Sequence, residues 1–208
     1  MTTDPGHLPA HWDRAFEAKT PDQHSWYQGS PRVSLQLIRR AAPRLDEPVI
    51  DVGGGASMLV DALLNQGFQD LTVLDISSAA LQISQRRLGE RAERIEWNCT
   101  DVRDFHPSRR FRLWHDRALF HFLVRQADRK QYRRALLEGL DVGGQLILAT
   151  FAIDGPTRCS GLDIVQYDAD KISVEFGRHF QLLEQVDERH FTPAGGEQRF
   201  SWFRLQRR

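Results

Sequence analysis

The sequence contains little cysteine, little lysine and no long apolar run, and each shortage argues against a class of protein. Two cysteines, Cys99 and Cys159, are too few for a disulfide framework. Together with eight histidines they show no spacing typical of a zinc site, so we expect no metal. The longest apolar stretch, around residues 146–153, is too short to cross a bilayer. The first six residues lack the basic and apolar regions of a signal peptide, so we expect a cytoplasmic protein with no membrane partner.

Charge of one sign is also missing. The 28 basic and 28 acidic side chains balance, so nothing indicates bulk attraction to nucleic acid. A length of 208 residues favours one domain with a substantial core. Apolar residues make up 40% of the chain and charged residues 27%, which is ordinary for a globular protein.

Hydrophobic periodicity predicts alternating helices and strands. Helices are expected near Trp12–Phe16, Val33–Ala41, Ser57–Gly67, Ser77–Leu88, Tyr132–Leu140 and Asp168–Phe176, with Ser57 and Ser77 as caps. Strands are expected at Val49–Val52, Leu71–Leu74, Arg94–Trp97, Phe111–His115, Gln145–Phe151, Phe180–His190 and Gln198–Gln206. Five strand–helix units indicate a parallel sheet wound on both faces, and the last two strands add a hairpin.

Glycines and acids mark the ends of two expected strands. Gly53, Gly54 and Gly55 follow an apolar run that ends in Asp51, and a second apolar run ends in Asp75. Such glycines let the backbone approach a nucleotide-type cofactor, and the second acid can accept from both ribose hydroxyls. A nicotinamide fingerprint would need a further glycine at position 58, where the chain has methionine.

The pattern acid-x-Gly-x-Gly, with Ser57 at the last glycine position, resembles the class I methyltransferases, which use S-adenosyl-L-methionine. The segments Leu71–Ile76, Asn98–Val102 and Gly143–Phe151 and the closing hairpin extend this resemblance over most of the chain. It implies an α/β, Rossmann-like, seven-stranded, mostly parallel sheet with helices on both faces. It also implies a cofactor site made of Asp51, Gly53, Gly54, Gly55, Asp75, Ile76, Asp101 and Val102, with Trp26 from the N-terminal segment. Within this site the resemblance implies that Ile76, Asp101 and Val102 contact the adenine.

The resemblance further implies that residues 1–45 form a helical lid over a methyltransferase core at residues 46–208. Aromatic side chains of the lid, Trp12, Trp26 and Tyr27, with His24, could exclude water and contact a sulfonium through cation–π attraction. The alternative is simple packing of these rings against the core.

Titratable side chains are concentrated at the end of the fourth expected strand. If that strand ends at His115, then Asp116 and Arg117 begin the loop beside the cofactor's methionine end. Asp116 could orient the cofactor or a substrate cation, and Arg117 could hold an anionic group. His121 is the first candidate base and His115 the second. An Asp116–Arg117 ion pair without catalytic function is the alternative.

The acceptor is predicted from the flanking motifs. Residues 11–13, 25–27 and 114–117 resemble small bacterial methyltransferases related to protein-lysine methyltransferases, and some motifs are similar to those of thiol methyltransferases. Where the lysine enzymes carry an Asp-Lys-Gly type sequence, this chain has Asp116-Arg117-Ala118. We therefore expect a small-molecule acceptor, with a thiol or another soft nucleophile favoured, and a monomer or weak homodimer. A protein-lysine methyltransferase and a non-catalytic cofactor-binding module are the alternatives.

Overall fold

The computed structural model describes residues 8–208. Residues 1–7 lie outside the described part, and the prediction about a signal peptide rests on that segment. The elements follow one another as α1 (Leu8–Ala18), η2 (Pro21–Gln23), α2 (Arg32–Ala41), β1 (Val49–Val52), α3 (Leu59–Asn65), β2 (Leu71–Asp75), α4 (Ser78–Leu88), η3 (Gly89–Arg94), β3 (Ile95–Cys99), β4 (Phe111–Arg117), η4 (Phe120–Phe122), α5 (Gln126–Gly139), β5 (Leu140–Phe151), β6 (Arg158–Cys159), β7 (Leu162–Asp163), α6 (Ala169–Phe176), β8 (Phe180–Phe191) and β9 (Glu197–Arg207).

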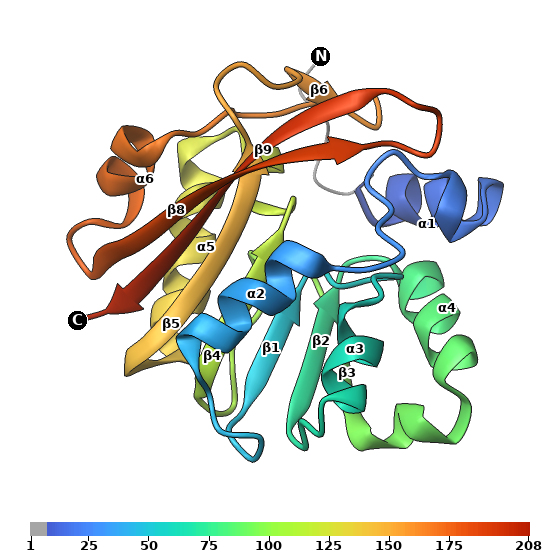
Figure 1. The fold of residues 1–208 in the computed structure, drawn as a ribbon, viewed down its shortest axis with the longest axis horizontal. Helices are drawn as coiled ribbons and strands as arrows, with labels where there is room; N and C mark the ends of the chain where they lie inside the picture. The colour runs from blue at the N-terminus through green and yellow to red at the C-terminus, as the bar shows by residue number, and fades with distance from the viewer. Residues whose placement is uncertain (1–7) are drawn as a thin grey trace.

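One seven-stranded sheet, in the order β3-β2-β1-β4-β5-β9-β8, forms the middle layer (Figure 1). Strands β1 to β5 run parallel, and the β8–β9 hairpin joins the edge of β5 with β9 antiparallel to it. The predicted α/β architecture with a C-terminal hairpin is thus confirmed. The strand order reverses beside β1, because the chain builds outward to β3 and then returns to place β4 on the other side.

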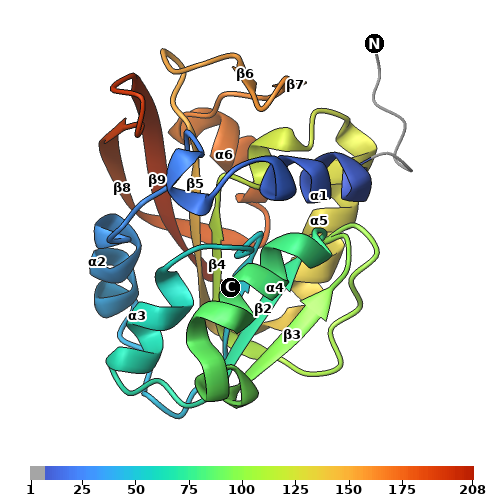
Figure 2. The same cartoon turned by 90° about the vertical axis from the view of Figure 1, so that its right-hand side faces the viewer.

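Helices cover both faces of the sheet (Figure 2). Residues of α2, α3 and α4 share one buried cluster with the sheet, and residues of α5 and α6 share a second cluster on the opposite face. Every residue of β1 and β2 is buried, as expected of central parallel strands covered on both sides. Among the described residues, no helix combines the length and apolarity that a membrane span requires.

Several predicted boundaries differ from the structure. Strand β4 continues to Arg117 instead of ending at His115, so the loop predicted at Asp116 is wrong. Helix α5 begins at residue 126, and β5 begins at residue 140, through Gly143 and Gly144. The pairing of β4 with β5 shifts register there, and the positive φ of Gly143 (77°) explains how a glycine pair that resembles a stop signal lies inside a strand. The short β6–β7 hairpin was not predicted.

The N-terminal segment has two parts with different surroundings. Helix α2 packs through Leu37 and Ile38 into the core cluster, as one of the helices that cover the sheet. Helix α1 and η2 lie instead at the carboxyl edge of the parallel strands, beside α4 (Figure 1). Of the predicted lid at residues 1–45, the part that overhangs this edge is α1 and the segment up to α2, and its action as a lid stays a prediction.

A carboxylate fastens α1 to the core. Asp13 Oδ1 accepts from Ser77 Oγ at 2.7 Å and from the backbone N–H of Ala79 at 3.1 Å. Ser77 is itself the N-cap of α4, because its Oγ accepts from the N–H of Ala80. Asp13 therefore completes the capping of α4 from outside that helix, at the end where the helix dipole favours a negative charge.

We expect Asp13→Ala to lower the free energy of unfolding by about 1–2 kcal/mol, because it removes two hydrogen bonds at a helix N-terminus. Urea denaturation followed by circular dichroism measures the change. Glu17→Ala, an exposed acid on the same helix, is the matched control and should change stability by less than about 0.5 kcal/mol. Equal stabilities of the two variants would show that Asp13 does not fasten α1.

Candidate functional site

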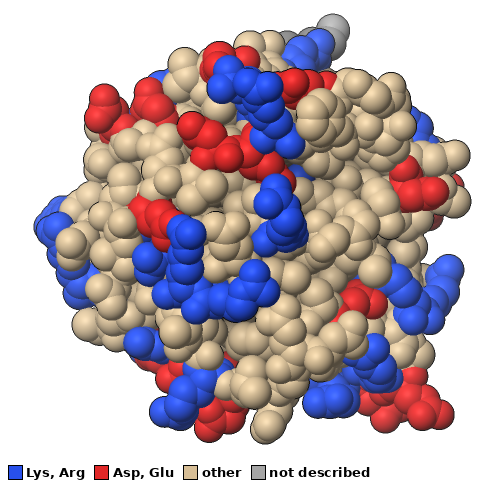
Figure 3. Space-filling view, viewed as in Figure 1, with Lys and Arg blue, Asp and Glu red and all other residues tan. Residues whose placement is uncertain are grey.

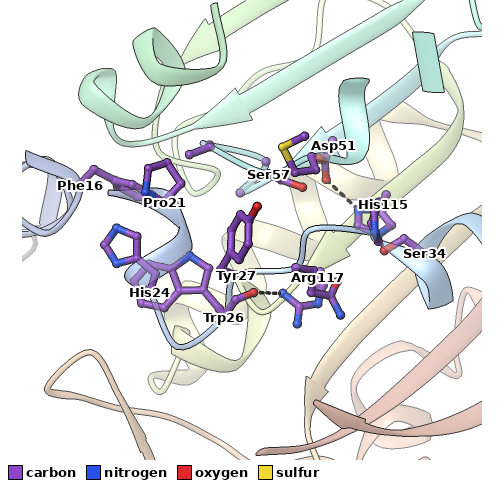
Figure 4. A pocket seen from close by; sticks show the side chains of 17 residues that line it. Phe16, Pro21, His24, Trp26, Tyr27, Ser34, Asp51, Ser57, His115 and Arg117 are labelled. Atoms are coloured by element: carbon purple, nitrogen blue, oxygen red, sulfur yellow. Dashed lines mark hydrogen bonds and ion pairs between the residues drawn. The ribbon is translucent and has the colours of Figure 1, made fainter. Parts of the chain in front are cut away.

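The candidate site lies where the strand order reverses, at the carboxyl ends of β1 and β4. Open α/β sheets bind ligands at such switch points, because loops leaving neighbouring strands diverge there. A cavity occupies this place and is lined by the loop after β1, by β1 and β4, by α2 and by the N-terminal segment (Figure 4). Side chains of residues 16–26 lie on one side of it, and Asp51, His115 and Ser34 lie on the other.

The loop after β1 brings backbone against two carboxylates. Gly53 and Gly55 have positive φ values of 72° and 35°. A Cβ at Gly54 would lie 2.7 Å from Asp51 Oδ2, and one at Gly55 would lie 2.8 Å from Asp75 Oδ2. Glycine is therefore needed at both positions, and the loop forms a cradle of bare backbone on the cavity wall.

Asp75 is a buried carboxylate without a cation. Its Oδ1 accepts from the backbone N–H of Ser77 at 2.8 Å, and within residues 8–208 no basic side chain pairs with it. Burial raises the pKa of Asp75 to about 7, although the hydrogen bond from Ser77 opposes this shift. A carboxylate held in this way keeps unused acceptor capacity beside the glycine loop, which fits the two hydroxyls of a ribose.

Three buried polar side chains form a chain of hydrogen bonds on the cavity wall. His115 Nδ1 lies 2.7 Å from Asp51 Oδ1, and His115 Nε2 lies 3.0 Å from Ser34 Oγ (Figure 4). With Asp51 ionised, Nδ1–H donates to the carboxylate, and Nε2 accepts from the Ser34 hydroxyl. Ser34 was not a candidate in the sequence, because a serine on the apolar face of a helix carries no signal of its partner.

Alternation along β4 separates the predicted site residues. His115 and Arg117 point to the face that carries the cavity, and both line it. Asp116 points to the opposite face, where Oδ1 accepts from the N–H of Leu119 at 3.0 Å. Burial raises the pKa of Asp116 to about 7, against the effect of that hydrogen bond. The alternative of an Asp116–Arg117 ion pair is therefore wrong, since the two side chains lie on different faces.

His121 is fully buried and is not among the residues that line the cavity. Its Nδ1 accepts from the backbone N–H of Phe151 at 3.3 Å, and its ring packs against those of Phe122 and Phe151. Burial lowers the pKa of His121 to about 3, with a smaller contribution from the charge of Arg117. Because β4 extends to Arg117, the turn that contains His121 begins two residues later than predicted. His121 is buried there and does not line the cavity.

Aromatic rings of the N-terminal segment line the outer side of the cavity. Trp26 stacks on His24 with ring centres 4.5 Å apart, and it meets the edge of Trp12 at 5.9 Å. Phe16 and Tyr27 complete this wall. Burial lowers the pKa of His24, whose Nε2 has no hydrogen-bond partner among residues 8–208. The tertiary structure thus places on the cavity an imidazole whose neutral form is favoured by burial.

The residues predicted for the adenine lie away from this cavity, at the end of β2 and after β3. Ile76 follows Asp75 and is half-buried, and Val102 is buried in the cluster beneath α5. Asp101 forms an ion pair with Arg103, which also contacts Asp128. Their contact with adenine stays a prediction, whereas Asp51, Gly53, Gly54, Gly55 and Trp26 all line the cavity.

Comparisons with known proteins agree with this geometry. Residues 49–144 match the model of the family described as "Methyltransferase domain". The mouse "EEF1A lysine methyltransferase 2" is 24% identical over 202 residues, which cover 89% of this chain and 76% of the relative. The bovine "eEF1A lysine and N-terminal methyltransferase" is 26% identical over 149 residues, which cover 68% of this chain but only 21% of that protein.

Solved structures share the fold at low sequence identity. The structure reported for conversion of a disulfide bond into a thioacetal group during echinomycin biosynthesis has a TM-score of 0.77 at 17% identity, over 96% of this chain and 92% of its own. An Anabaena variabilis SAM-dependent methyltransferase gives 0.75 at 16% identity, with coverages of 98% and 94%. Burkholderia thailandensis 1,6-didemethyltoxoflavin-N1-methyltransferase, solved with S-adenosylhomocysteine, gives 0.71 at 17% identity, with coverages of 100% and 92%.

The fold, the glycine cradle and the family match together define a class I methyltransferase. The family match covers residues 49–144, and the solved structures that share the fold include S-adenosylmethionine-dependent methyltransferases, so the cofactor is S-adenosylmethionine. The site fits the cofactor, because Gly55 and Asp51 line the cavity, and the unpaired Asp75 lies directly behind the bare backbone of Gly55.

We expect Asp75→Asn to weaken binding of S-adenosylhomocysteine by about 1.5–3 kcal/mol, because it removes a charged hydrogen-bond acceptor. Isothermal titration calorimetry measures this. The control is Asp70→Asn, which alters an acid just before β2 that pairs with Arg109.

Asp75→Asn should also stabilise the ligand-free protein at pH 8. The folded pKa of about 7 exceeds the ordinary value of 3.8, so ionising Asp75 reduces stability as the pH rises through that interval. The gain in the free energy of unfolding should fade toward pH 4. In the binding experiment, an unchanged affinity of Asp75→Asn for S-adenosylhomocysteine would contradict the assignment of Asp75 to the ribose.

Proposed function

We propose that the protein transfers the methyl group of S-adenosylmethionine to a small-molecule acceptor, with a thiol or another soft nucleophile favoured. The observation that carries this proposal is the charge of the cavity wall. Among the described lining residues the one acid is Asp51, which His115 already engages, whereas Arg117 adds an unpaired cation. A lysine ammonium would meet a cation there, and the one carboxylate is already hydrogen-bonded to His115, so a neutral or anionic acceptor fits better.

The imidazoles support a nucleophile that needs little help from a base. Both nitrogens of His115 are engaged, and His121 is behind the wall with a pKa lowered by burial to about 3. His24 lines the cavity and its Nε2 has no hydrogen-bond partner among residues 8–208, so it is the base candidate for an acceptor that must lose a proton. A thiol ionises near neutral pH, so alignment alone can suffice for it.

The protein can accelerate methyl transfer mainly by positioning the two reactants. The cofactor supplies a methyl group on a sulfonium, already activated toward in-line attack. The chain's contribution is to hold the two reactants at the carboxyl ends of β1 and β4, and such orientation can supply about 7–11 kcal/mol of acceleration. Phe16, Trp26 and Tyr27 exclude water from the outer side of the cavity.

The related proteins support both readings of the acceptor. The structural neighbour from echinomycin biosynthesis converts a disulfide into a thioacetal, and the Burkholderia neighbour methylates a nitrogen of a small molecule. The mouse and bovine relatives are named for lysine and N-terminal methylation of eEF1A. A protein-lysine methyltransferase is therefore the alternative function. A non-catalytic cofactor-binding module is the second alternative, and methyl transfer to any acceptor would reject it.

The oligomeric state, the cellular location and the absence of other partners stay predictions. We propose a monomer or weak homodimer in the cytoplasm, without nucleic-acid or membrane partners. Both Cys99 and Cys159 are free thiols, which suits a reducing compartment. Basic and acidic side chains are spread over the face shown in Figure 3, which suits a protein without a polyanionic partner.

Incubation of the protein with a cell extract and methyl-labelled S-adenosylmethionine tests the acceptor class directly. We expect the label in the small-molecule fraction after the proteins have been precipitated, because Arg117 on the cavity wall disfavours a lysine ammonium. A reaction without enzyme and one with Asp75→Asn provide the controls. Label confined to the protein fraction would reject a small-molecule acceptor and favour the lysine alternative.

We expect His121→Asn to change turnover at neutral pH by less than about tenfold, because its ring packs behind the wall and its pKa is far below neutrality. The measurement is kcat with an acceptor found in the extract experiment, after circular dichroism has shown that the variant is folded. The companion variant His24→Gln reports on the imidazole that does line the cavity. A fall of about 10²-fold or more in a folded His121 variant would restore it as the general base.

A further inference from the structure

Arg117 is a cation of the cavity wall that lacks a counterion. Its Nη1 donates to the backbone oxygen of Trp26 at 2.9 Å, and its guanidinium lies 4.9 Å from the ring centre of Phe200. Nε and Nη2 are buried and have no hydrogen-bond partner in the described part of the chain. No carboxylate within residues 8–208 forms an ion pair with this side chain. Buried charges in proteins are normally paired, so this arrangement is costly without a ligand.

The neighbouring carboxylates are held away from Arg117 by other donors. Asp51 is engaged by His115 Nδ1. Glu188 accepts from Gln28 Nε2 through Oε1 and from Trp202 Nε1 through Oε2, each at 2.8 Å. Both acids attract the guanidinium through space, yet Glu188 has a neutral donor on each oxygen and Asp51 Oδ1 is bonded to His115. Burial lowers the pKa of Arg117 to about 10, which leaves it charged at neutral pH.

The two unpaired nitrogens of Arg117 present their N–H donors in a geometry that fits a ligand with two neighbouring oxygens. Nε–H and the adjacent N–H of Nη2 form one parallel edge of the guanidinium, and this edge matches the two oxygens of a carboxylate. Cation–π attraction to Phe200 offsets part of the burial of charge but provides no hydrogen-bond acceptor in the guanidinium plane.

We propose that the Nε–Nη2 edge of Arg117 is a carboxylate-binding site, filled by the amino-acid end of the cofactor or by a carboxylate of the methyl acceptor. This inference rests on the proposed function. The remaining donor, Nη1, holds Trp26, so the same guanidinium joins a bound carboxylate to the N-terminal segment that walls the cavity. If the acceptor is the source, the acceptor class narrows to small anionic molecules.

Arg117→Met tests the site without relying on activity. The variant removes a half-buried charge that has no counterion, so the melting temperature of the ligand-free protein should stay the same or rise. An arginine with only a structural role would lower it when lost. The control is Arg109→Met, because Arg109 pairs with Asp70 at 2.6 Å and should lose stability without any change in ligand affinity.

Calorimetry then identifies the source of the carboxylate. S-adenosylhomocysteine has the amino-acid end, whereas 5′-methylthioadenosine has the same adenosine and sulfur without it. If the cofactor is the source, Arg117→Met weakens S-adenosylhomocysteine about tenfold to a hundredfold and leaves 5′-methylthioadenosine unchanged. If the acceptor is the source, both retain affinity, and benzoate or formate binds the wild-type complex with S-adenosylhomocysteine but not the variant complex. Arg117→Lys, which keeps the charge without the paired edge, should restore only part of the affinity.

Two results would overturn the inference. One is a fall in the melting temperature of Arg117→Met with no change in any ligand affinity. The other is equal affinity of wild type and variant for all four probes. Failure of the wild type to bind S-adenosylhomocysteine at all would instead reject the cofactor on which the proposed function depends, so the two failures are distinguishable.

Discussion

The candidate site depends on how β1 is registered against β4. Asp51 pairs with His115 across the two parallel strands, so their side chains leave the same face side by side and meet at 2.7 Å. Alternation then directs Arg117 to that face and Asp116 to the other. A slip of one residue would bring Asp116 beside Asp51, two acids without a cation. Because both strands are buried on both faces, the core fixes this register strongly.

Unpaired charge is the second feature of the site. Asp75 is buried and Arg117 is half-buried, each without a counterion. Burial raises the pKa of Asp75 and lowers the pKa of Arg117, so it favours the neutral form of each. Such groups reduce the stability of the ligand-free protein, and they provide the interactions that a zwitterionic cofactor or an anionic acceptor can complete. Asp51, by contrast, already has His115 and Ser34 behind it, which fixes the direction of its carboxylate.

The N-terminal segment reaches its place through contacts with distant parts of the chain. Asp13 caps α4, Gln28 binds Glu188 of β8, and the backbone oxygen of Ser25 lies 2.7 Å from His190 Nε2. Arg117 of β4 adds the contact to Trp26. These contacts tie the aromatic wall to both halves of the sheet, and they make the C-terminal hairpin a support of the site as well as an edge of the sheet.

The sequence by itself determined the sheet, the glycine cradle after Asp51, the acid at the end of β2 and hence the cofactor class. These features lie in short, contiguous patterns whose physical requirements are local, such as buried β-branched runs and residues without a Cβ. Only the tertiary structure decided that Arg117 faces the cavity while Asp116 and His121 do not, and that Ser34 and His24 join it. Periodicity shows that neighbours on a strand alternate, but which set faces the ligand depends on where the strand ends and on what packs against each face. That information comes from residues far away in the chain.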